Sequence, residues 1–257
     1  LYDRGVCERF DAFDASPAYL ARAEADRGDR PIHYLRSDFR SFVPDATYDL
    51  VVNVAALHHA QHLHRHVARL RAAMDPDGIL VNWEYVGPRR NQYPRLQLAA
   101  MRAVRDALPE RFRTPHPLKP TRRDAVCGDP TEAVHSDEIL RAIDDHFEVV
   151  LRNDLGGGIA YQLLWNFVEP FEAGDPEARA ALAAILRADE QQTGTSQVPA
   201  MFTYLVARPR RSTTAAARAR VHLVEPLREL APRVLKGRYP VEAVQELGER
   251  AISRLRR

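Results

Sequence analysis

Apolar runs alternate with amphipathic stretches over residues 8–87, and this alternation predicts the fold. Four runs have the length and the β-branched and aromatic content of strands: RFDAFDAS, IHYLRSDF, TYDLVVNVAAL and GILVNWEYVG. The third is apolar enough for the middle of a sheet. Strands separated by helices at this spacing favour a parallel sheet with helices on both faces. The pattern therefore predicts an α/β, doubly wound fold.

Two helices are expected between these strands. In SPAYLARAEADRG, Ser16 is placed as the N-cap, Pro17 takes the first helical position and Gly28 follows the end. The second helix, QHLHRHVARLRAAM, is predicted to end at the turn DPDG. Its expected apolar face consists of Leu63, Val67, Leu70 and Met74.

Composition narrows the class of protein. The chain has 257 residues, 45% of them hydrophobic, which suffices for one domain of ordinary size with an appendage. The sequence contains no run near the roughly 18 apolar residues of a membrane span, and its first residues, LYDRGVCERF, lack the pattern of a signal peptide. Cys7 and Cys127 have no metal-site spacing and are too few for a disulfide scaffold. We therefore expect a cytoplasmic protein with reduced thiols.

The charge of the chain changes at residue 209. Residues 209–257 contain 12 Lys and Arg against 5 Asp and Glu, whereas the whole chain has a net charge of only +2. The segment begins with a polar linker, RSTTAAARAR, and continues with two stretches patterned as amphipathic helices, VHLVEPLREL and VEAVQELGERAISRL. We predict a basic helical appendage over residues 209–257 that forms a homo-oligomer or binds a protein partner. A solvated helical face is the simpler interpretation of its charge.

Acidic residues follow two strands of the predicted sheet. In doubly wound sheets, ligands bind beyond the carboxyl ends of the strands. Asp14 ends the first strand, where a carboxylate can accept hydrogen bonds from both hydroxyls of a ribose. Asp38 follows the second strand and precedes Phe39, so the acid can accept from an adenine amino group while the ring packs against the base. Strand-end aspartates are also ordinary turn formers, and it is their repetition that indicates a nucleotide site.

These segments resemble the class I S-adenosylmethionine-dependent methyltransferases. The resemblance rests on FDAFDASPAYL, LRSDFRSF, TYDLVVNVAALHH and MDPDGILVNWEYVGP, and the Leu-His-His is similar to quinone-type and natural-product methyltransferases. It implies a Rossmann-like domain over residues 1–208, with AMFTYLVARP as an antiparallel last strand beside the strand in SDEILRAIDDHFEVVLRNDL. It also implies S-adenosylmethionine as the cofactor. The expected cofactor-binding residues are Asp14, Ala15, Ser16, Asp38, Phe39, Asn53 and Val54.

The family's first strand and glycine-rich loop are expected before Leu1. The stretch NDLGGGIAY, residues 153–161, looks like such a loop, because three glycines follow an apolar strand and an acid. The next strand, FTYLVARP, does not end in a ribose-binding acid, however. We therefore interpret the glycines as a turn that needs positive φ or a close approach of the backbone.

Methyl transfer depends chiefly on alignment of the acceptor with the methyl group, and only some acceptors need a base. The candidate catalytic residues are His58 and His59, after the third strand, and His135. Loop packing or substrate orientation competes with catalysis as the role of the histidine pair, and His135 suits a surface position equally well. No metal site is predicted: His62 and His66 have the i, i+4 spacing, but no third ligand accompanies them.

The acceptor is expected under a cap formed by residues 88–137, a helix followed by a Pro-rich stretch that is longer than a simple connection. The candidate substrate-binding residues are Glu84, Tyr85, Tyr93 and Tyr161. Packing of the cap onto the body explains these aromatic residues at least as well.

We predict an S-adenosylmethionine-dependent methyltransferase whose acceptor is a small molecule: a natural product, a sugar or a lipid-linked compound. A catalytically silent methyltransferase-like scaffold is one alternative. A nicotinamide-dependent oxidoreductase is another, because the ribose-binding acid is shared, but the sequence has no Tyr-x-x-x-Lys pair. A nucleic-acid substrate is disfavoured, because NVAALHH stands where methyltransferases of base amines have a Pro-Pro-Tyr type of sequence.

Overall fold

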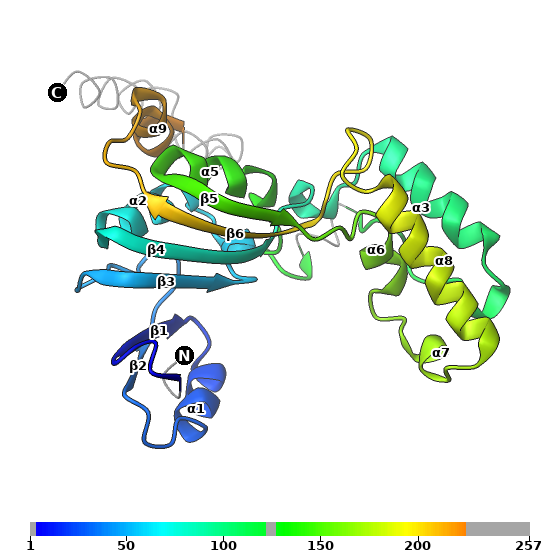
Figure 1. Ribbon diagram of the computed structural model, residues 1–257, viewed down its shortest axis with the longest axis horizontal. Helices are drawn as coiled ribbons and strands as arrows, with labels where there is room; N and C mark the ends of the chain where they lie inside the picture. Colours follow the sequence, from blue (N-terminus) through cyan, green and yellow to red (C-terminus); the bar gives the residue numbers. More distant parts are fainter. Residues whose placement is uncertain (1–3, 122–126, 225–257) are drawn as a thin grey trace. The chain divides into compact units, whose positions relative to one another are not determined.

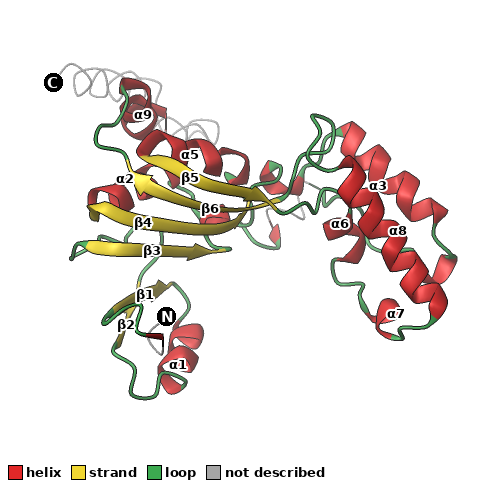
Figure 2. Ribbon diagram, in the orientation of Figure 1, coloured by secondary structure: helices red, strands yellow, loops and turns green. Residues whose placement is uncertain are grey.

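The computed structural model describes residues 4–121 and 127–224, and these fall into two compact units. One unit ends at Ala46 and the other begins at Thr47. Each unit has its own sheet. Figure 1 labels the elements along the chain, and Figure 2 distinguishes helices from strands.

The first unit is a strand–helix–strand element. β1 (Phe10–Asp14) and β2 (Ile32–Arg36) pair in parallel, and α1 (Pro17–Ala25) connects them. The predicted N-cap is confirmed, since the Ser16 hydroxyl accepts a hydrogen bond from a backbone N–H of the first helical turn at 3.4 Å. Gly28, in the loop after the helix, has a φ of +61°, which glycine adopts without strain.

The second unit is built on a four-stranded sheet. In spatial order its strands are β3 (Tyr48–Val54), β4 (Met74–Tyr85), β6 (Phe202–Pro209) and β5 (Phe147–Asp154). β3 and β4 are parallel, whereas β6 is antiparallel to both of its neighbours. The predicted antiparallel last strand is thereby confirmed, and with it the Rossmann-like α/β class.

Two helices of the second unit, α2 (Leu63–Ala72) and α5 (Ile139–His146), pack against each other beside this sheet (Figure 1). α2 buries Leu63 and Val67, as its predicted apolar face requires. Leu70, predicted for the same face, is half-buried.

The segment predicted to end this helix belongs to β4. Met74 does not extend the apolar face of α2; it begins β4 and pairs with Tyr48. The predicted turn DPDG therefore lies within the strand, where the register with β3 shifts. Pro76 has no backbone N–H to contribute to a ladder, so an irregularity is expected at this point.

A separate group of helices shares its own core. α3 (Arg95–Ala107), α6 (Ala160–Leu164), α7 (Glu169–Glu172) and α8 (Pro176–Gln192) lie together beyond the end of the sheet at which β4 finishes (Figure 1). The segment predicted as a cap, residues 88–137, supplies α3, and the connection between β5 and β6 supplies the other three. Fully buried core residues include Met101, Ile159, Leu163 and Ile185. The shorter 3₁₀ turns include η2 (Leu57–His59), η3 (Arg89–Asn91), η4 (Glu110–Phe112) and η5 (Ser136–Glu138).

The sequence predicts one doubly wound sheet, whereas the structure has a two-stranded and a four-stranded sheet. In the usual strand order of such folds, the first strand separates the second from the fourth. Among the described residues, β1 and β2 pair only with each other.

The described part of the predicted appendage is helical. The expected polar linker contains α9 (Ala215–Ala219), because Thr214 caps an alanine-rich stretch by accepting a hydrogen bond at 3.1 Å. A π-helical turn, η6 (Arg220–Val224), follows it. Most of the first predicted amphipathic helix, and all of the second, lie outside the described residues. Across residues 4–121 and 127–224, no helix combines the length and apolarity needed to cross a membrane.

Candidate functional site

A buried carboxylate organises the loop that follows β3. Glu84, near the end of β4, is fully buried. Its Oε2 accepts hydrogen bonds from Nδ2 of Asn53 at 3.0 Å and from the backbone N–H groups of residues 56 and 57 at 2.9 and 2.7 Å. Its Oε1 accepts from the backbone of Tyr85 at 2.8 Å and contacts Nδ1 of His58 at 2.6 Å. Burial favours the neutral acid, but these hydrogen bonds outweigh it and hold the pKa of Glu84 below its ordinary value.

His58 is held by this carboxylate. The residue is buried in the turn η2. Burial lowers the pKa of His58, but the hydrogen bond and charge of Glu84, together with the charges of Glu132 and Asp129, outweigh burial and raise it. Because an ionised carboxylate can only accept, Nδ1 of His58 carries the proton in this contact. Its Nε2 lies 3.7 Å from Oε2 of Glu132.

His59 lies beside His58, with ring centroids 4.1 Å apart. Its Nδ1 is 3.1 Å from Oγ1 of Thr131, and its Nε2 is 3.8 Å from Oε2 of Glu132. The structure thus brings two of the predicted catalytic histidines together with an acid that sequence reasoning missed. Glu132 lies far along the chain and belongs to no recognisable motif, so only the fold reveals it.

His135 takes a different position. It directly precedes η5, and its neighbour Val134 donates a backbone hydrogen bond to the carbonyl of His58 at 3.0 Å. The segment therefore lies against the histidine loop, but His135 is not a member of the His58, His59 and Glu132 group. Its predicted catalytic role stays a prediction.

In the first unit, Asp14, Ala15 and Ser16 form a tight turn between β1 and α1. Oδ1 of Asp14 accepts a hydrogen bond from the backbone N–H of Ser16 at 2.6 Å, and Ser16 in turn caps α1. Among the residues described, Oδ2 of Asp14 has no hydrogen-bond partner. The turn thus leaves one carboxylate oxygen to accept from a ribose, which remains the predicted role.

Asp38 is engaged within its own loop. Its Oδ1 accepts from the backbone of Arg40 at 2.9 Å and from both the backbone and the hydroxyl of Ser41 at 2.7 Å. The hydrogen bonds from Ser41 lower the pKa of Asp38 to about 2. The Phe39 ring packs edge-on against Phe13, with centroids 5.6 Å apart. The structure thus displays the turn-forming role of this acid, and contacts with adenine stay a prediction.

The predicted cofactor residues of β3, Asn53 and Val54, differ in exposure. Asn53 is buried, and its Nδ2 donates to Oδ1 of Asn82 at 2.7 Å and to Glu84. Val54 is 60% exposed. Because both amide hydrogens of Asn53 are engaged, its side chain supports Glu84, and a cofactor would meet its backbone.

The predicted substrate-binding tyrosines belong to an aromatic core at the end of β4. Tyr85 and Tyr93 are buried, and Tyr161 packs against Phe202 with centroids 4.9 Å apart. Burial raises the pKa of Tyr161 to about 12 and raises the pKa of Tyr85 and of Tyr93 as well. These side chains pack the helical group against the sheet. This is the alternative role given above for the aromatic residues, packing of the cap onto the body. Glu84, the fourth candidate, is enclosed and positions His58.

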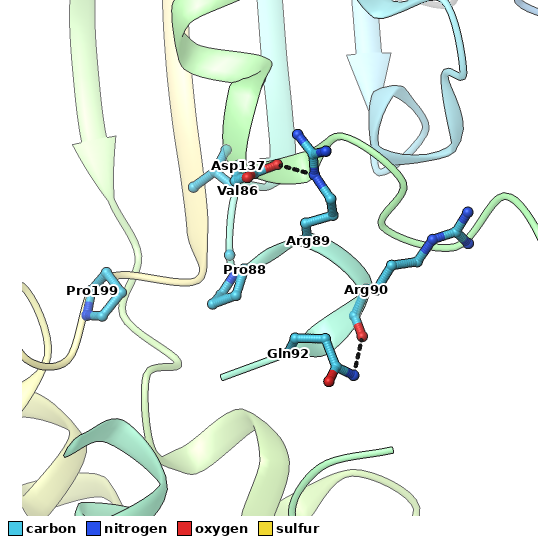
Figure 3. A pocket seen from close by; sticks show the side chains of 8 residues that line it. Val86, Pro88, Arg89, Arg90, Gln92, Asp137 and Pro199 are labelled. Carbon is cyan, nitrogen blue, oxygen red and sulfur yellow. Dashed lines mark hydrogen bonds and ion pairs between the residues drawn. The ribbon is translucent and has the colours of Figure 1, made fainter. Parts of the chain in front are cut away.

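A cavity of about 650 Å³ begins directly after Tyr85 (Figure 3). Arg89, in its wall, pairs with Asp137 at 3.1 Å and also with Glu138. The guanidinium of Arg90 donates to two backbone carbonyls at 3.3 and 3.2 Å. Both arginines are therefore engaged by neighbouring groups. The lining residues are Val86, Gly87, Pro88, Arg89, Arg90, Gln92, Asp137 and Pro199.

The glycine-rich stretch after β5 binds a side chain of the protein itself. Gly156 and Gly157 have φ values of +81° and +83°. The backbone N–H groups of Gly157, Ile159 and Ala160 donate to the carboxylate of Asp189, on α8, at 2.8, 2.7 and 2.9 Å. The donors that an anionic ligand would need are occupied. The glycines of NDLGGGIAY make the turn between β5 and α6, with the positive φ that was predicted.

Residues 1–82 match a family model described as "Methyltransferase domain". Residues 1–82 are therefore similar to methyltransferase domains. This match supports the predicted S-adenosylmethionine-dependent methyl transfer, with S-adenosylmethionine as the cofactor. None of the curated proteins matches its sequence.

Several solved structures are similar to this chain. An S-adenosylmethionine-dependent methyltransferase from Mesorhizobium loti has 17% identity and a TM-score of 0.45, over 80% of this chain and 82% of that one. The N-methyltransferase NodS from Bradyrhizobium japonicum has 12% identity and a TM-score of 0.40, over 79% and 74%. The cyclopropane synthase MmaA2 from Mycobacterium tuberculosis has 17% identity and a TM-score of 0.40, over 79% and 70%.

Proposed function

We propose that this methyltransferase acts on a small molecule that binds in the cavity after β4. The main support for this proposal is the cavity, because its volume of about 650 Å³ lies within the range of small-molecule sites. It adjoins the carboxyl end of β4, and ligands of doubly wound sheets bind on that side. Its lining comes from the segment that follows β4, from η5 and from the loop before β6.

The acceptor that suits this cavity carries little charge. Arg89 is neutralised by two acids, and Nη1 of Arg90 is already engaged by two backbone carbonyls, so neither side chain is fully available to an anionic group. A natural product, a sugar or a lipid-linked compound with a hydroxyl or amino group fits this lining. The sulfonium methyl is already activated, so alignment in the cavity supplies much of the acceleration. A cytoplasmic location belongs to the same proposal.

His58 and His59 are proposed to act at this acceptor. The rings of His58 and Tyr85 lie 6.2 Å apart, and the Tyr85 hydroxyl donates to the carbonyl of Pro88 at 3.3 Å. Pro88 lines the cavity. The histidine loop and the acceptor cavity are thus joined through one buried tyrosine.

Calorimetric titration of S-adenosylhomocysteine into the intact protein, with NADH in parallel, tests the cofactor assignment. We expect micromolar binding of S-adenosylhomocysteine and none of NADH. Asp14→Ala should weaken binding by at least about tenfold, or about 1.4 kcal/mol, whereas Asp29→Ala, at an exposed position of the same unit, should not. Binding of NADH alone would favour an oxidoreductase, and binding of neither would favour a scaffold.

The acceptor cavity is tested by a substitution that fills it. Val86→Trp places a large ring among the lining residues, well away from Asp14 in the sequence. The variant should bind S-adenosylhomocysteine as the parent does and should lose methyl transfer to any acceptor that a small-molecule screen identifies. Undiminished transfer by the folded variant would place the acceptor elsewhere.

A further inference from the structure

We infer that His58, His59 and Glu132 form a binding site for one divalent transition-metal ion, with Zn²⁺ as the best match. One ligand atom from each residue lies within 4.8 Å of the others. Nε2 of His58 and Nε2 of His59 are 3.7 and 3.8 Å from the same oxygen, Oε2 of Glu132. Donor atoms roughly 2.0–2.1 Å from a tetrahedral Zn²⁺ lie roughly 3.3 Å apart. Each nitrogen is therefore within about half an ångström of the separation from the Glu132 oxygen that a shared ion requires.

The hydrogen bond to His58 leaves the correct nitrogen for the ion. Oε1 of Glu84 lies 2.6 Å from Nδ1 and can only accept, so Nδ1 carries the proton. In the neutral imidazole, the lone pair then belongs to Nε2, the atom that faces Glu132. A carboxylate that receives the distal N–H of a ligating histidine is the usual outer partner in metal sites, where it fixes the ring and raises its basicity.

His59 has the same arrangement through a hydroxyl. The Thr131 hydroxyl donates its proton to Oδ1 of Asp129 at 2.7 Å, so its oxygen accepts from Nδ1 of His59 at 3.1 Å. The lone pair of His59 therefore also belongs to Nε2, which faces Glu132. Two independent contacts set the two histidines to the same tautomer and direct both lone pairs at one carboxylate oxygen.

Charge and access favour a cation at this place. Three carboxylates, those of Glu84, Glu132 and Asp129, surround two imidazoles, so the cluster has a surplus of negative charge. The side chains of His59 and Glu132 are 33% and 37% exposed, which gives an ion a route from solvent. Imidazole nitrogen favours Zn²⁺ over Mg²⁺, which prefers oxygen. Three protein ligands also leave one coordination position open for water or for an acceptor oxygen.

Zinc binding to the intact protein tests the site. The measurement requires neither cofactor nor acceptor. Failure to bind zinc would therefore be distinguishable from failure of the proposed methyl transfer. The protein is stripped with a chelator, passed through a desalting column and titrated with ZnCl₂ in competition with a chromophoric chelator. We expect one Zn²⁺ per chain, and excess MgCl₂ should leave the titration unchanged.

Variants locate the ion. His59→Gln and Glu132→Gln remove one ligand each from partly exposed positions, and each should lower the affinity for Zn²⁺ by more than the roughly 10–100-fold that loss of an outer partner costs. Glu84→Gln, which removes no ligand but alters the outer partner of His58 and the hydrogen bonds that hold its loop, should fall within that range. His116→Gln, at an exposed position, and Cys127→Ser, which removes an exposed thiol, should bind as the parent does.

Two results would overturn the inference. One is absence of micromolar Zn²⁺ binding by the parent protein. The other is binding that is equally tight in His59→Gln and Glu132→Gln, with far-UV circular dichroism showing that both variants are folded, because the ion would then lie elsewhere. Replacement of Zn²⁺ by Co²⁺ adds a direct signature, since a His₂Glu site should give visible bands of a four-coordinate ion that Glu132→Gln weakens.

Discussion

Replacing Asp189 by asparagine tests whether the glycine-rich turn is held by the protein's own carboxylate. Oδ1 accepts from the backbone of Ile159 and Ala160 and from the Thr193 hydroxyl, and Oδ2 accepts from the backbone of Gly157. Asparagine keeps one acceptor oxygen, but its NH₂ group meets the N–H of Gly157, donor against donor. Hydrogen bonds to a charged group contribute roughly 1.5–3 kcal/mol each. Losing one and weakening the others should lower the free energy of unfolding by about 2–4 kcal/mol.

Urea unfolding, followed by tryptophan fluorescence and far-UV circular dichroism, measures this loss. Glu190→Gln is the matched control, because it makes the same charge change at the next position of α8, where the side chain is exposed. The control should stay within about 0.5 kcal/mol of the parent. Equal unfolding midpoints for the two variants would refute the argument. Weakened binding of S-adenosylhomocysteine by a folded Asp189→Asn variant would instead assign the turn to the cofactor site.

Two further predictions concern single residues. Gly157→Ala should lower the free energy of unfolding by about 1–2 kcal/mol, because the added Cβ lies 3.0 Å from the Phe202 ring at a φ of +83°; calorimetry should find the affinity for S-adenosylhomocysteine unchanged. Because Asp38 has a folded-state pKa of about 2, its carboxylate stabilises the fold above the pKa of the unfolded chain, and this contribution disappears as the pH falls toward about 2. Asp38→Asn should therefore lower thermal stability at neutral pH but not near pH 2, whereas Asp45→Asn, at an exposed position, should change neither.

Much of the fold follows from local pattern. Ser16 followed by Pro17 marks the start of α1, and the apolar run that contains residues 48–54 is a strand in the structure. Local signals fail where pairing decides the outcome. Met74 suits the apolar face of α2, yet it pairs with Tyr48, and β4 begins there. Likewise, the sequence shows a cap over residues 88–137 but not that α6, α7 and α8 complete its core, because those contacts join segments far apart in the chain.

The candidate site was predictable only in part. The position of His58 and His59 after a strand is visible in the sequence, whereas their joint approach to Glu132 depends on how the later loop folds back. One signal was available for the role of Glu84. Alternation along β4 puts it on the same face as Asn82, two residues earlier, and both are fully buried. Two polar residues on a buried face indicate a hydrogen-bonded network rather than direct contact with substrate.

That network explains why the sheet retains an ionised group in its interior. A buried carboxylate is often no more stabilising than an apolar side chain of similar size. The presence of Glu84 and its five hydrogen bonds is therefore not explained by stability alone. Ala55, in the loop that they hold, has a φ of +47°, which is costly for a residue other than glycine. Glu84 compensates by accepting the next two backbone N–H groups and Nδ1 of His58. The orientation of the His58 ring is therefore set by β4, a rigid element, before an ion or an acceptor binds. Methyl transfer depends on alignment of the acceptor, and such preorganisation provides it.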